Sequence, residues 1–130
     1  MPQVLLVQDD QDAAFMMRRA LDRAQPGVDM TVVEDGDAAL RALEDPKAPF
    51  DLVLLDLHLP RMSGLQLLET LSAKSDRMPP VVVLTGSSSP EETTEARRLG
   101  AKSVVEVPCD LRRLQDLMRG VCRAYLRPTA

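Results

Sequence analysis

The sequence predicts one domain of the α/β class, in which a parallel sheet carries helices on both faces. The chain has 130 residues, a common size for one domain with one core. It contains five strand-sized apolar runs, and each run precedes a segment with helical periodicity. Such regular alternation is typical of parallel strands joined by right-handed crossovers. The five runs are Val4–Val7, Met30–Val33, Leu52–Leu55, Val81–Leu84 and Val104–Val107.

The apolar runs are continuous and do not alternate with polar residues, which indicates strands buried on both faces of the sheet. Even a run such as Leu52–Leu55 is far too short to span a bilayer. Because no linker, repeat or low-complexity segment interrupts the pattern, we expect residues 1–130 to form a single domain.

Apolar stripes predict the first three helices. The second of these follows Asp37 and ends before Pro46, and the third follows Gly64. The first has its apolar stripe at Ala14, Met17, Leu21 and Ala24.

Capping residues predict the last two helices. Ser89 can cap the fourth helix, with Pro90 at its first position and Glu92 three residues after the cap. Gly100 closes that helix as a C-terminal glycine. Asp110 can cap the fifth helix, which carries a run of inward-facing apolar residues.

Composition excludes several classes of protein. The net charge of −4 argues against nucleic-acid or anionic-membrane binding, since both need a basic surface. The N-terminus has no charged segment or cleavage site of a signal peptide. Cys109 and Cys122 are too few for a disulfide framework and lack metal-ligand spacing. We therefore expect a cytoplasmic protein with two plain thiols.

Polar residues at the carboxyl ends of the strands form the candidate site, because open α/β sheets bind ligands at that edge. Each residue alone is more often a turn former or a cap, but together they place several carboxylates and a hydroxyl at one edge. Crowded carboxylates repel one another, and a hard cation such as Mg²⁺ relieves the repulsion. The polar residues are Gln8, Asp9, Asp10, Asp56 and Thr85, and Pro108 follows the fifth strand at the same edge.

These residues stand in segments that resemble the receiver domains of bacterial response regulators. The resemblance covers nearly the whole chain in order and spacing, and it implies a flavodoxin-like doubly wound fold with strand order 2-1-3-4-5. The segments are Asp9 and Asp10 after the first strand, Asp51–Pro60 with Met62–Gly64, Val81–Gly86, Leu99–Ala101 and Val107–Pro108.

The resemblance implies a phosphoacceptor in a two-component phosphorelay, whose only catalysis would be of its own phosphorylation and dephosphorylation. Asp56 would take a phosphoryl group from a histidine kinase, and Thr85 would contact that group and act as a switch. Asp9, Asp56 and the backbone carbonyl of His58 would bind Mg²⁺, with Asp10 as a further candidate ligand. By the same resemblance, the peptide bond before Pro108 would be cis.

Three positions depart from the family pattern. Gln8 replaces an acid, so we expect weak Mg²⁺ binding. Val107 replaces a lysine that bonds the phosphoryl group, and Val104 replaces an aromatic switch residue. Arg61 or His58 could approach the site in place of that lysine. We interpret His58 chiefly as an exposed loop residue at the rim of the site, because a lone histidine makes no ligand cluster.

With no output domain expected after the fifth helix, the output would be contact with a downstream protein. By the resemblance, the phosphoryl donor would be a histidine kinase. The segment Leu57–Gly64 resembles regulators that work with bacteriophytochromes, which favours a kinase of that class. A homodimer through the fourth and fifth helices would pair basic with acidic side chains: Arg112, Arg119, Arg123 and Arg127 with Glu91, Glu92 and Glu95. The alternative function is a degenerate receiver that docks proteins without phosphorylation. A flavin-binding protein is disfavoured because the first loop is acidic.

Overall fold

The computed structural model describes residues 2–45, 47, 50–74 and 78–126. Its five parallel strands lie in the order β2-β1-β3-β4-β5, which confirms the predicted fold class and strand order. The strands are β1 (Gln3–Val7), β2 (Asp29–Val33), β3 (Leu52–Leu55), β4 (Val81–Thr85) and β5 (Ser103–Glu106). The helices are α1 (Gln11–Ala24), α2 (Gly36–Glu44), α3 (Gly64–Lys74), α4 (Pro90–Arg98) and α5 (Leu111–Tyr125).

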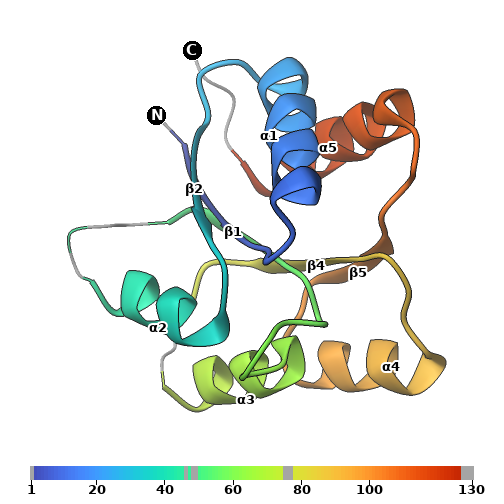
Figure 1. Cartoon of the computed structure of the whole chain (residues 1–130). Coiled ribbons are helices and arrows are strands. Elements are labelled where there is room, and N and C mark those ends of the chain that lie inside the picture. The colour runs from blue at the N-terminus through green and yellow to red at the C-terminus, as the bar shows by residue number, and fades with distance from the viewer. Residues whose placement is uncertain (1, 46, 48–49, 75–77, 127–130) are drawn as a thin grey trace.

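The helices cover the two faces of the sheet as separate layers (Figure 1): α1 and α5 lie on one face, and α2, α3 and α4 on the other. Alternate residues of each central strand therefore enter different cores. In β1, Leu6 packs with the α1–α5 core and Leu5 with the other. The side chains of β3 and β4 are buried throughout, as the continuous apolar runs predict.

The strand register places the candidate site residues next to one another. Val7 is paired with Leu55, so the residues that follow them, Gln8 and Asp56, leave the sheet side by side. The backbone N–H of Asp56 donates to the carbonyl of Val7 at 3.1 Å. Parallel pairing thus brings the ends of β1 and β3 together at one edge of the sheet.

The predicted caps of the last two helices are confirmed, whereas α2 begins at Gly36, before the predicted start after Asp37, with Asp35 as its cap. Ser89 and Glu92 form a capping box at the start of α4, and the Asp110 side chain accepts the backbone N–H of Arg112 at the start of α5. Gly100, which follows α4, has φ of 109°, a left-handed conformation that glycine adopts without steric cost.

Two predictions near the end of the sheet need correction. β5 spans Ser103–Glu106, one residue earlier than expected. Val107 still donates its N–H to Thr85 at 2.8 Å, but Pro108 has no N–H and the ladder cannot continue. The described residues contain no cis peptide bond, so the bond before Pro108 is trans, the isomer that X–Pro bonds favour by about 0.5–1 kcal/mol.

Candidate functional site

A cavity of about 350 Å³ opens at the carboxyl edge of the sheet. It lies where β1, β3 and β4 end and where the chain leaves β5. The structure thus brings together most of the residues predicted from the strand ends. The cavity is lined by Gln8, Asp9, Asp10, Ala13, Met17, Asp56, Leu84, Gly86 and Val107.

Asp56 is the half-buried carboxylate of this cavity. Desolvation by burial raises the pKa of Asp56 above its ordinary value, and the charge of nearby Asp9 adds to that rise. A hydrogen bond from the backbone of His58, the charge of His58 and a hydrogen bond from Gln8 act in the opposite direction. Burial prevails, so this carboxylate holds its charge at an energetic cost.

Gln8 is a donor to Asp56, and this role follows from its other contact. Only 6% of Gln8 is exposed, and its Oε1 accepts the backbone N–H of Asp10 at 3.1 Å. A backbone N–H only donates, so the oxygen of the amide must face Asp10. The NH₂ group is left for the hydrogen bond with Asp56. Where the resemblance implies an acid, this chain therefore has a neutral hydrogen-bond donor.

Asp9 and Asp10 have different surroundings although they are adjacent. Asp9 is exposed at the mouth of the cavity. Asp10 caps α1, and its Oδ1 accepts the backbone N–H groups of Asp12 at 2.9 Å and of Ala13 at 3.2 Å. Asp10 is therefore occupied with the helix terminus, and Asp9 is the freer carboxylate beside Asp56.

The donor set at this edge fits a magnesium ion that keeps several waters. Asp9 and Asp56 line the same cavity and offer carboxylate oxygens, whereas the backbone carbonyl of His58 stays a predicted ligand. Within the described ranges, no group of three or more His, Cys, Asp or Glu side chains could enclose a metal. Magnesium needs no such enclosure, because it commonly binds through one or two carboxylates.

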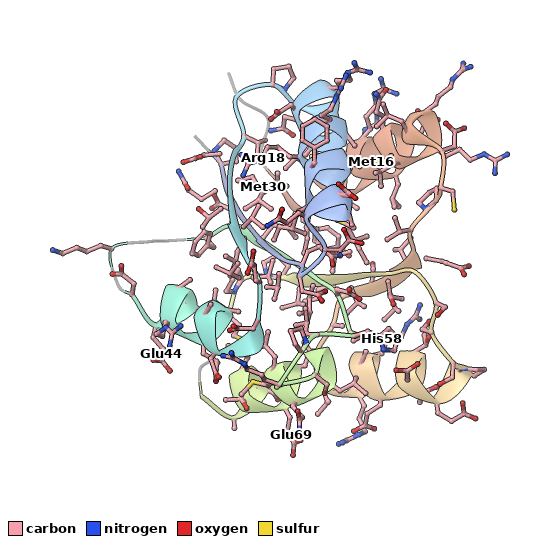
Figure 2. All side chains as sticks on the ribbon, in the orientation of Figure 1. Met16, Arg18, Met30, Glu44, His58 and Glu69 are labelled. Atoms are coloured by element: carbon pink, nitrogen blue, oxygen red, sulfur yellow. The ribbon has the colours of Figure 1, made fainter. Side chains whose placement is uncertain are left out.

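Thr85 is completely buried at the end of β4, with 1% of its surface exposed. It does not line the cavity: its hydroxyl donates to the carbonyl of Ser87 at 2.9 Å. The same carbonyl lies 3.0 Å from Nε2 of His58. Figure 2 shows His58 on the loop after β3, on the side that faces α4. As predicted, His58 is exposed, and its imidazole also contacts the loop before α4.

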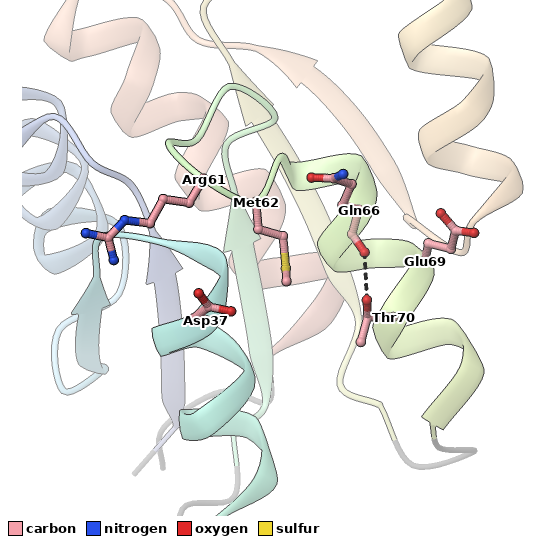
Figure 3. Close-up of a pocket in the computed structure, with 6 residues that line it drawn as sticks. All are labelled: Asp37, Arg61, Met62, Gln66, Glu69 and Thr70. Carbon is pink, nitrogen blue, oxygen red and sulfur yellow. Dashed lines mark hydrogen bonds between the residues drawn. The ribbon is translucent and has the colours of Figure 1, made fainter.

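No Lys or Arg side chain of the described residues lines the Asp56 cavity. Arg61 instead lines a second cavity, of about 430 Å³, between α2 and α3. In Figure 3, Arg61 extends over the start of α2, above Asp37 and away from α3. The hypothesis that Arg61 approaches the site in place of a lysine is therefore not supported by this conformation.

The charged residues predicted for a dimer are partly engaged within the chain. Arg119 pairs with Asp116 at 2.7 Å, and Glu95 pairs with Arg98. Glu92 belongs to the capping box of α4. Arg127 lies outside the described residues. The homodimer thus stays a prediction, with fewer free acidic partners on α4 than the sequence indicates.

Sequence reasoning did not predict the backbone carbonyl of Ser87 as a contact point of the site. A carbonyl oxygen carries no sequence signal, and its direction depends on the conformation of the loop. The apolar wall that Met17 and Leu84 give the cavity was also not predicted, although both residues were expected in buried elements.

The sequence matches the response regulator receiver domain family over residues 4–119. It is 36% identical over 127 residues to the sensory transduction protein RegX3 of Mycobacterium tuberculosis, which covers 95% of this chain and 52% of RegX3. This chain thus spans about half the length of the curated relatives it matches. No helix in the described part of the chain has the length and apolar character needed to cross a membrane.

Two solved structures have a closely similar fold. The Mn²⁺-bound form of the response regulator Rcp1 matches with a TM-score of 0.84 and 25% identity, over 100% of this chain and 98% of that one. The phosphorylated cyanobacterial phytochrome response regulator RcpA matches with a TM-score of 0.86 and 24% identity, over 99% and 96%. At that identity, the likeness to RcpA concerns the fold alone.

Proposed function

Because this chain belongs to the response regulator receiver domain family, we propose that Asp56 accepts a phosphoryl group from a phosphohistidine of a partner kinase. The observation that carries the proposal is the position of Asp56 within the cavity. Its carboxylate is partly desolvated and close to the charge of Asp9. A desolvated carboxylate with a raised pKa is a better nucleophile than one in bulk water.

In the proposed reaction, a carboxylate oxygen of Asp56 attacks the phosphorus atom. The P–N bond of the donor breaks, and the imidazole leaves with the electron pair and takes up a proton from solvent. Phosphoryl transfer needs positioning and charge stabilisation more than covalent chemistry from the protein. The backbone N–H of His58, 3.2 Å from Oδ1 of Asp56, and the amide of Gln8 would hold the carboxylate in place.

Asp9, Asp56 and the carbonyl of His58 would hold Mg²⁺. When bound, the ion would neutralise charge on the phosphoryl oxygens. The response regulator Rcp1, whose crystal structure is of a Mn²⁺-bound form, supports the binding of a divalent ion by this chain. We expect weak binding, because Gln8 brings no charge and Asp10 caps α1.

Thr85 would contact the phosphoryl group only after leaving the Ser87 carbonyl, to which its hydroxyl now donates. The hydroxyl would exchange one acceptor for another, more highly charged one. Hydrogen bonds to charged groups are stronger, at about 1.5–3 kcal/mol against about 1 kcal/mol for neutral pairs. This difference gives phosphorylation the free energy to move the loop after β4.

The proposal includes a cytoplasmic location and output by contact with a downstream protein, without nucleic acid. It leaves the bacteriophytochrome as a prediction about the kinase, since the likeness to the phytochrome regulator RcpA concerns the fold alone. The receiver would catalyse at most its own phosphorylation and dephosphorylation.

A second candidate function is a docking module that works without phosphorylation. The observation in its favour is the absence of a basic side chain among the described residues that line the cavity, with Val107 at the wall. A phosphoryl group there would lack the cation that usually pairs with it.

The deciding experiment is intact mass spectrometry after incubation with Mg²⁺ and acetyl phosphate. We expect one phosphoryl adduct that requires Mg²⁺ and is absent from Asp56→Asn. Asp37→Asn, which removes an exposed carboxylate of the α2–α3 cavity, should be modified like the wild type. If neither acetyl phosphate nor a histidine kinase modifies Asp56, the docking module becomes the better conclusion.

A further inference from the structure

The side chain of His58 joins the loop between β4 and α4 to the loop after β3. Nε2 of His58 lies 3.0 Å from the carbonyl of Ser87 and 3.8 Å from Oε2 of Glu92. A carbonyl only accepts hydrogen bonds, so Nε2 carries the hydrogen and donates it to Ser87. This bond joins two loops that are 29 positions apart in the sequence.

His58 also contacts the phosphoacceptor through its backbone. Its N–H donates to Oδ1 of Asp56 at 3.2 Å, while its imidazole holds the carbonyl that Thr85 also uses, at 2.9 Å. His58 therefore contacts the Asp56 carboxylate through its backbone and the β4–α4 loop through its imidazole.

The far end of this connection is the start of α4. Oε1 of Glu92 accepts the backbone N–H of Ser89, and the Ser89 hydroxyl accepts the N–H of Glu92. The imidazole thus lies beside the capping box that begins the helix. A change in the position of His58 would reach α4 through contacts that already exist.

We propose that His58 is a positioning residue that ties the β4–α4 loop and the start of α4 to the segment carrying Asp56. It holds the Ser87 carbonyl in place while Thr85 is bonded to it, and it links a change at Asp56 to α4. Val104 carries no ring that could make such a link from β5. The link to phosphorylation rests on the proposed function. The hydrogen bond by which His58 holds the β4–α4 loop does not depend on it.

Amide hydrogen exchange of the unphosphorylated full chain, followed at Ser89 and Glu92 by NMR, tests whether His58 holds the loop. Gln places an amide nitrogen where Nε2 of His58 lies, whereas Asn reaches only as far as Nδ1. We expect His58→Gln to exchange within about twofold of the wild type, and His58→Asn and His58→Ala to exchange at least fivefold faster. Equal exchange in all four proteins would overturn the proposal. Equally fast exchange in the Gln and Asn variants would also overturn the proposal. It would show that a nitrogen at the position of Nε2 does not slow exchange, and that only the loss of the imidazole ring matters.

A second measurement tests the link to the site, with beryllofluoride and Mg²⁺ as the phosphoryl mimic on Asp56. The amide resonances of Ser89 and Glu92 should shift in the wild type and in His58→Gln, and at most half as far in His58→Asn. Equal shifts in the Asn variant would refute the link. If the wild type binds no mimic and gains no phosphoryl adduct, the proposed function fails, and the exchange experiment still decides whether His58 holds the loop.

Discussion

Replacing Gly64 by alanine should displace the backbone of Asp56 and Leu57, which Gly64 approaches closely. A Cβ at this position would lie 2.6 Å from the carbonyl oxygen of Asp56 and 2.6 Å from Cα of Leu57. Ordinary contacts of a Cβ begin at 3.4 Å, so the two segments must separate by about 0.8 Å. Both neighbours are backbone atoms, which cannot rotate out of the way as a side chain can.

The magnitude follows from two opposing effects. Overpacking of this kind costs about 1–3 kcal/mol, and alanine at the start of α3 recovers about 0.5–1 kcal/mol because it restricts the unfolded chain. We expect a net loss of about 1–2 kcal/mol in the free energy of unfolding. A displacement of about 1 Å can cost a factor of about 100 in rate, so phosphorylation of Asp56 should slow by about tenfold to a hundredfold.

Urea unfolding measures the stability of the Gly64→Ala variant, and the initial rate of adduct formation measures its activity. Gly86→Ala is the matched control: Gly86 lines the same cavity, but nothing lies within 4 Å of its added Cβ. Its stability should change by less than about 0.5 kcal/mol. A Gly64→Ala protein as stable and as reactive as this control would show that the close approach does not constrain Asp56.

Three further changes test the charges of the site. Asp56→Asn should be more stable than the wild type at pH 7 in urea unfolding: burial raises the folded pKa of this acid, so the wild type loses stability as the pH rises through that range. The advantage should vanish at a pH low enough to protonate Asp56 in both states, and a constant difference would refute the reasoning. Val107→Lys should speed phosphorylation by acetyl phosphate about tenfold or more, because a charge-assisted bond contributes about 1.5–3 kcal/mol; an unchanged rate would mean that the new ammonium group does not reach the phosphoryl group. Gln8→Glu should tighten Mg²⁺ binding about tenfold in calorimetry, since affinity rises with the charge of the ligands, and unchanged affinity would place the ion elsewhere.

The sequence was sufficient to predict the fold because its signals were repeated along the chain. Five apolar runs, each followed by a helix with its own cap or stripe, leave few alternatives to a parallel sheet. Even a single position such as Ser89 carried a complete local signal, which the capping box confirms. The end of β5 was harder to place, because Val107 keeps a ladder bond that its neighbour Pro108 cannot extend.

The candidate site was predictable as a group of positions but not as a set of contacts. Residues at strand ends meet because of the sheet register, and so Asp9 and Asp56 were expected beside each other. The direction of the Gln8 amide depends on the N–H of Asp10, and the partner of His58 depends on how the Ser87 carbonyl is turned. Both are consequences of loop backbone geometry, which has no periodic pattern in the sequence.

The packing of α1 against α5 has a consequence for synthesis of the chain. The buried face of α1, including Met17 and Leu21, shares one core with Met118 and Val121 of α5, although about a hundred residues separate them along the chain. While the ribosome is still adding the middle strands, α5 is not yet present to bury that face of α1 and the sheet face beside it. Until residues near 126 have emerged, the nascent chain therefore presents an apolar surface that can aggregate or bind a chaperone.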